Sequence, residues 1–149
     1  MKKYSFRLQT VLEIREKKLE EKRREMAVVI ARLNEQNEYL EHLAKTQLQV
    51  IDILEKIYDS GKELDILEVT NYKSYFGQLI VDIKNQEEIV KKTEMLLKFK
   101  QLEVTEALKE VKVLEKLKEK QEKKFYQNYE RLQAKEIDDI ASTRYRKAS

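Results

Sequence analysis

The stretch SGKELDILEVTNYKSYFGQ, residues 60–78, contains both glycines of this 149-residue chain, which has no proline. Glycine and proline are the residues that most often interrupt helices and form turns. Gly61 follows Asp-Ser and can adopt the left-handed conformation that ends a helix. Asp65 and Glu68 have the spacing of a capping box, with Asp in place of the usual Ser or Thr. These signals predict a turn at about 60–65.

Long helices are expected on both sides of this turn. We expect one helix at about 3–59 and a second at about 66–141, followed by a basic tail at 142–149, all within a single domain (1–149). Gly77 falls inside the second helix, where glycine costs about 1 kcal/mol of helix propensity relative to alanine. Either the close approach of a neighbour or a slight kink would account for it.

The composition favours a coiled coil and excludes several other classes. Charged residues make up 40% of the chain and hydrophobic residues 41%, which is typical of long paired helices. The net charge of +3 is small for a nucleic-acid binder. There is no apolar run of about 18 residues that could span a bilayer, and no secretory signal at the N-terminus. We expect a cytoplasmic protein that binds no nucleic acid and does not insert into the membrane.

Apolar residues recur every seven positions in both arms, which indicates helical seams with a left-handed supercoil. The companion series of the first arm has two alternatives, which the sequence leaves open: Ile30, Ala44, Ile51 and Tyr58, or Leu8, Val29, Leu43, Val50 and Ile57. The main series are Leu12, Leu19, Met26, Leu33, Leu40, Gln47 and Leu54 in the first arm, and Phe76, Ile83, Val90, Leu97, Val104, Val111, Lys118, Phe125 and Leu132 in the second.

Because an apolar stripe needs a partner, the turn predicts that the two arms pair with each other. The predicted fold is all-α: an antiparallel coiled-coil hairpin with a longer C-terminal helix. Tyr4 should then lie near Glu122, and about 20 residues should project beyond the N-terminus, roughly 30 Å of helix. Apolar side chains continue along this projection, so it is a candidate site for an external partner. A dimer of unbent helices would satisfy the same stripes and remains an alternative.

No catalytic, metal-binding or cofactor-binding residues are expected. His42 is the only histidine, and cysteine is absent, so no zinc site can be assembled. Adjacent carboxylates such as Asp138 and Asp139 diverge around a helix and are poorly placed for acid–base catalysis. No glycine-rich loop is present to hold a nucleotide phosphate. We therefore expect a protein that is not an enzyme.

Three segments together resemble the family of the flagellar export protein FliJ. The N-terminal pattern of an aromatic residue, leucine, an aliphatic pair and arginine is matched by Phe6, Leu8, Val11, Leu12 and Arg15. The segment NYKSYFGQLIVDIKNQ (71–86) is similar to the family's sequence just after the turn. Near the C-terminus, the acidic and aliphatic residues 136–140 precede Arg144 and Arg146, as in the family. The resemblance covers the whole chain.

This resemblance implies a non-enzymatic component of the flagellar type III protein export apparatus. The end that bears the chain termini is expected in the pore of the hexameric export ATPase FliI, where it promotes ring assembly and activity. The export gate protein FlhA, through its cytoplasmic domain, and export chaperones are the other implied partners. The implied location is cytoplasmic, at the periphery of the inner-membrane export apparatus.

The resemblance also implies two sets of binding residues. The export-gate contact falls on Tyr72, Tyr75, Leu79 and Gln86, although Asp82 stands where relatives can have a small residue. By its position next to the seam, Tyr75 is expected on the surface and Phe76 in the core, whereas Tyr72 could belong to either. The ATPase-binding tip comprises Phe6, Leu8, Arg15, Phe125, Tyr129, Leu132 and Ile137.

A second interpretation is a generic coiled-coil stalk subunit of a rotary-type ATPase, or a chaperone-like hairpin. A prefoldin-like arm needs a β-hairpin in the middle of the chain, and SGKELDILEV supplies at most one short strand. A stalk subunit would usually be longer. Both points favour the export-apparatus interpretation.

Overall fold

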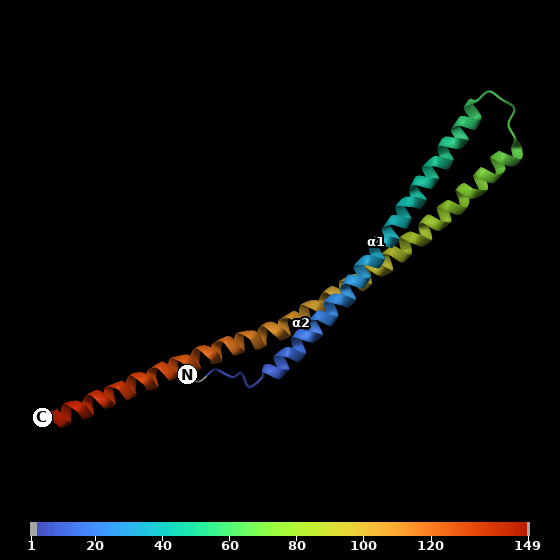
Figure 1. Ribbon diagram of the computed structural model, residues 1–149. Helices are drawn as coiled ribbons and strands as arrows, with labels where there is room; N and C mark the ends of the chain where they lie inside the picture. The colour runs from blue at the N-terminus through green and yellow to red at the C-terminus, as the bar shows by residue number, and fades with distance from the viewer. Residues whose placement is uncertain (1–2, 149) are drawn as a thin grey trace. The chain divides into compact units, whose positions relative to one another are not determined.

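The computed structural model describes residues 3–148 as two helices, α1 (Gln9–Asp59) and α2 (Ile66–Ala148), of 51 and 83 residues. The chain turns back between them (Figure 1). Cross-helix contacts such as those of Arg15 with Glu110 and of Gln86 with Gln36 show that the helices run antiparallel. No strand occurs among the described residues. The predicted all-α hairpin is confirmed.

The turn is built from the glycine and the aspartate that signal it in the sequence. Gly61 has a φ of 69°, in the left-handed region that ends a helix at low cost only for glycine. The Asp65 carboxylate accepts hydrogen bonds from the backbone N–H groups of Leu67 (3.1 Å) and Glu68 (3.4 Å). Asp65 is therefore the N-cap of α2, which satisfies two of the donors left free at a helix start.

The two outer helix ends differ from the sequence-based bounds. Instead of beginning near residue 3, α1 begins at Gln9, because the preceding segment leaves the helix path so that Phe6 is buried and Tyr4 reaches α2. At the other end α2 does not stop near 141 but continues to Ala148, so the described part of the basic tail is helical. The tail contains neither glycine nor proline, and Arg146 and Lys147 lie in the last turn, where cations favour the helix dipole.

The hairpin divides into two compact units rather than one. The terminal unit combines the chain up to Lys22 with α2 from Val104 onward, and the turn unit comprises Arg23–Glu103. In the terminal unit, the segment before α1 and both helices contribute to one buried cluster: Phe6, Leu12, Leu19, Ala107 and Val111.

The predicted register is confirmed in the terminal unit. The Tyr4 hydroxyl donates to Gln121 Oε1 at 3.3 Å, and the neighbouring Glu122 carboxylate is close enough to affect the Tyr4 pKa. An ion pair joins Arg15 to Glu110 at 2.9 Å. These contacts place residues 4–15 beside residues 110–121 of α2.

In the turn unit the structure selects between the two companion series of α1. The core cluster consists of Leu43, Val50 and Leu79, with Leu54, Tyr72, Phe76 and Ile83 packed around it. Val29 is also buried, whereas Ile30 and Tyr58 are exposed. The series of Leu8, Val29, Leu43, Val50 and Ile57 therefore faces α2.

The companion series of α2 is partly polar. It follows Leu79 at seven-residue intervals with Gln86, Thr93 and Lys100 before apolar residues return at Ala107. Gln86 Nε2 donates to the backbone carbonyl of Gln36 at 3.0 Å, and Lys100 pairs with Glu25 at 3.1 Å. Polar layers of this kind fix the register of a coiled coil at some cost in stability.

Candidate interaction surfaces

The first candidate surface is the end of α2, where no other described segment of the chain packs against the helix. The side chains from 130 to 148 are exposed, and α2 continues past the N-terminal segment (Figure 1). This overhang carries large apolar side chains in water: Leu132 is 63% exposed, Ile137 65% and Ile140 55%. Solvated apolar side chains on an unpaired helix are the usual mark of a protein-binding surface.

An aromatic cluster marks the base of the overhang. The rings of Tyr4 and Phe125 are 5.6 Å apart, and those of Phe125 and Tyr126 are 5.4 Å apart in an edge-on arrangement. Desolvation and, secondly, the Glu122 carboxylate raise the pKa of the Tyr4 hydroxyl above its ordinary value. The cluster therefore attaches the N-terminal segment to α2 at the point where the overhang starts.

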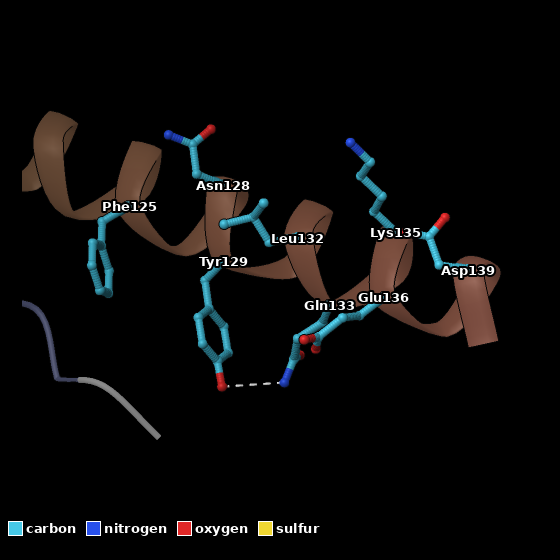
Figure 2. Close-up of a pocket in the computed structure, with 8 residues that line it drawn as sticks. All are labelled: Phe125, Asn128, Tyr129, Leu132, Gln133, Lys135, Glu136 and Asp139. Carbon is cyan, nitrogen blue, oxygen red and sulfur yellow. Dashed lines mark hydrogen bonds between the residues drawn. The ribbon is translucent and has the colours of Figure 1, made fainter.

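An open hollow of about 710 Å³ follows this cluster along α2 (Figure 2). Tyr129 stands in it, with its hydroxyl accepting a hydrogen bond from Gln133 Nε2 at 3.2 Å. Lys135, Glu136 and Asp139 line its far end. The hollow thus offers aromatic and apolar contacts at one end and charged groups at the other.

The predicted tip residues fall into two groups. Phe6 is buried, Leu8 packs against the same core, and Arg15 is held by Glu110. These three support the paired part of the terminal unit. The others lie at or along the overhang: Phe125 and Tyr129 are half-buried, and Leu132 and Ile137 are exposed.

The second candidate surface lies just after the turn, and here burial separates the four residues assigned to the gate. Tyr75 is 48% exposed, as its position beside the seam predicts, while Tyr72 packs against the core cluster. Leu79 is only 2% exposed and Gln86 only 7%. The two tyrosines line one shallow hollow with Glu68 and Asn71. Of the four residues, only the two tyrosines are therefore accessible to a partner.

Sequence reasoning missed exposed apolar residues that lie outside the seven-residue series. Ile66 (80% exposed) and Leu67 (70%) open α2, and Ile80 and Val81 follow at about half exposure. These positions carry no periodic signal in the sequence. Their exposure in the structure is what distinguishes them from core residues.

Two further properties bear on function. No group of three or more His, Cys, Asp or Glu residues is placed to hold a metal ion within the described range, 3–148. Neither helix, over the residues that the structure describes, is both long and apolar enough to cross a membrane.

Residues 4–149 match the family of the flagellar FliJ protein. The chain belongs to the FliJ family. It is therefore a coiled-coil component of the flagellar type III export machinery. The FliJ family is a non-enzymatic part of this machinery. The resemblance deduced from the sequence is confirmed.

Comparison with solved structures finds a chain described as a homolog of YscO, CT670 from Chlamydia trachomatis. It is 23% identical, with a TM-score of 0.48, and the alignment covers 97% of this chain and 96% of that one. A comparison with curated protein sequences finds no match.

Proposed function

We propose that this FliJ-family chain promotes assembly and activity of the export ATPase FliI and couples the ATPase to the export gate protein FlhA. The observation that carries the proposal is the overhang of α2, an unpaired helix with exposed Leu132, Ile137 and Ile140. The protein would act in the cytoplasm, at the periphery of the inner-membrane export apparatus.

The mechanism needs no chemistry on this chain. A ligand that binds a closed ring more tightly than separate subunits shifts the equilibrium toward the ring by its difference in affinity. In the proposal, Phe125, Tyr129, Leu132 and Ile137 contact the ATPase pore, while Phe6, Leu8 and Arg15 hold the helix that presents them. The ATPase then turns over faster because more of it is in the assembled state.

The gate contact is proposed for the hollow after the turn. Tyr75 and Tyr72 would contact the FlhA cytoplasmic domain directly. Leu79 and Gln86 are buried, so their proposed role is to hold α2 in the register that turns Tyr75 outward. Export chaperones are proposed as a third class of partner.

The ATPase proposal is tested by removing residues 130–149 and measuring FliI turnover and ring assembly. The full chain is expected to increase both, and the shortened chain neither. The thermal melting curve should stay unchanged, because the removed side chains that the structure describes, 130–148, are exposed and none belongs to the buried core cluster. If the full chain leaves turnover and assembly unaffected, or the shortened chain stimulates as well as the full one, the proposal is wrong.

The gate proposal is tested with Tyr75→Ala in a binding titration against the FlhA cytoplasmic domain. Truncation of an exposed aromatic anchor at an interface should weaken binding at least tenfold. Tyr145→Ala is the matched control, since this tyrosine is 78% exposed on the overhang. Equal affinity for the two variants would exclude Tyr75 from the gate contact.

A further inference from the structure

Gly77 has no explanation within this chain. It lies in the interior of α2, where glycine weakens a helix, yet α2 runs through it without a break. A Cβ added at Gly77 would meet no atom within 4 Å. Of the two accounts that the sequence allows, a close neighbour and a kink, the first finds no neighbour among the described residues of the chain, and α2 stays helical through Gly77. A neighbour from another molecule remains.

The surroundings of Gly77 form a helical stripe with a charge at each end. Lys73, Gly77, Ile80 and Lys84 follow one another at steps of four, three and four residues, so they lie on one face of α2. Ile80 is 48% exposed and both lysines are exposed. Among the described residues, neither lysine forms an ion pair, and Lys73 instead lies 5.9 Å from the ring centre of Tyr58.

The α1 side of the same face is also apolar. The contact of Lys73 with Tyr58 fixes which positions meet on this face. Ile51 precedes Tyr58 by seven residues, and Ile80 follows Lys73 by seven. Because a coiled coil repeats its packing every seven residues, Ile51 and Ile80 should face each other across the helices as Tyr58 and Lys73 do. Leu48, 65% exposed, lies one turn before Ile51. The face thus carries apolar side chains from both helices, and Gly77 lies among them with open space where a side chain would be.

We propose that this face, within the turn unit, binds an acidic amphipathic helix of another protein. The partner's apolar side would rest on Gly77, Ile80 and Ile51, where the missing Cβ lets its backbone approach closely. Its carboxylates would reach Lys73 and Lys84, which are eleven residues apart on α2, about 16 Å. This mode of recognition is a helix laid in an apolar groove.

The charges distinguish this occupant from two others. If two copies of the chain paired symmetrically through the stripe, Lys73 of each would stand opposite Lys84 of the other, and like charges facing each other oppose association. An anionic membrane would meet the carboxylate of Glu55 as well as the lysines, because Glu55 lies one turn before Tyr58 on α1, while Asp52 is already paired with Lys56 at 3.0 Å. A helix with acidic residues only at its α2-facing edge avoids both penalties.

The surface is separate from the proposed gate contact. Successive residues of an α-helix are rotated by about 100°, so Gly77 and Tyr75 point to nearly opposite sides of α2. The inference therefore goes beyond the proposed function and can fail independently of it.

The test uses the full-length chain and a synthetic helical peptide of about 22 residues. The peptide carries one Leu/Ala face and two glutamates eleven residues apart. Titration into ¹⁵N-labelled protein should shift the amide signals of Ile51, Gly77 and Ile80 more than those around Tyr75. Gly77→Leu, which places a side chain in the close-approach position, should weaken binding at least tenfold and leave FlhA binding unchanged.

A charge exchange makes the test specific. Lys73→Glu with Lys84→Glu should weaken binding at least tenfold, and a peptide with lysines in place of its two glutamates should restore it. Lys112→Glu with Lys116→Glu, an equal change of net charge in the terminal unit, should alter the affinity less than twofold. Three results would overturn the proposal: equal binding by all variants, binding to phosphatidylglycerol vesicles but not to the peptide, or self-association of the chain that Gly77→Leu abolishes.

Discussion

Gly61 and Gly77 are the same residue type in opposite conformations, so the same substitution should change stability in opposite directions. Gly61 has a positive φ that an L side chain disfavours, whereas Gly77 is helical and faces open space. The sequence distinguishes the two, because one follows Asp-Ser at a helix end and the other lies inside a seven-residue repeat. It does not reveal that Gly77 lacks a neighbour within the chain.

Alanine at position 61 should lower the free energy of unfolding by about 1–2 kcal/mol, the cost of the left-handed conformation. Alanine at position 77 should raise it by about 1 kcal/mol through helix propensity alone. Urea unfolding followed by circular dichroism measures both. A loss of stability in Gly77→Ala would mean that something in the chain does occupy the space beside this residue.

Leu79 and Tyr75 should separate stability from binding. Leu79 is almost fully buried in the turn unit, so Leu79→Ala should cost about 2–5 kcal/mol. Tyr75→Ala changes an exposed side chain and should stay within about 0.5 kcal/mol of the parent. Thermal melts of the two variants decide the matter, and a large destabilisation by Tyr75→Ala would place its ring in the core.

At the scale of elements, the turn could be predicted and the outer helix ends could not. Gly61 and Asp65 act locally, through backbone conformation and capping, so the sequence alone carries their signal. The start of α1 depends on Phe6 reaching the core across the hairpin, which is a tertiary effect. No stop signal marks the end of α2 in the sequence, so the bound of about 141, at the start of the basic tail, falls short of the observed Ala148.

The seam of α2 shows a similar division. Its apolar series was visible in the sequence, but the companion series contains Gln86, Thr93 and Lys100, which resemble surface residues. The burial of Gln86 and Thr93 and the half-burial of Lys100 follow only from the pairing with α1, where Gln86 reaches the Gln36 carbonyl and Lys100 reaches Glu25. Gln86, which the family resemblance implies as a gate residue, is therefore buried in the seam.

The docking of the N-terminal segment should weaken at alkaline pH. The pKa of Tyr4 is raised in the folded protein, so its docked form favours the protonated hydroxyl. This contribution is fully present below the ordinary tyrosine pKa of about 10 and is lost as the pH rises through the higher folded value. Amide exchange of residues 3–8 should therefore increase more steeply above pH 10 than base catalysis alone explains, and Tyr4→Phe should remove the excess. If Tyr4→Phe shows the same excess rise in amide exchange, a group other than the Tyr4 hydroxyl causes it.

For the whole molecule, unequal arm lengths and a central turn were enough to predict an unpaired C-terminal helix, and that helix is the main support for the proposed ATPase contact. The division into a terminal unit and a turn unit was not predictable, because no glycine or proline marks the sequence at either boundary. Family membership gives the setting in the export apparatus, while the surfaces on each unit define what remains to be tested.

The pairing of α1 with α2 in one chain underlies all of these proposals, and one distance tests it directly. Because the chain has no cysteine, spin labels can be attached at Glu13→Cys and Lys112→Cys, two exposed positions of the terminal unit. Double electron–electron resonance should give a distance of about 20–30 Å between the two labels, as expected for labels on helices packed 8–10 Å apart. Dilution with unlabelled protein should not change this distance. A distance near 150 Å, as for one unbent helix, or a short distance that disappears on dilution, would contradict the hairpin.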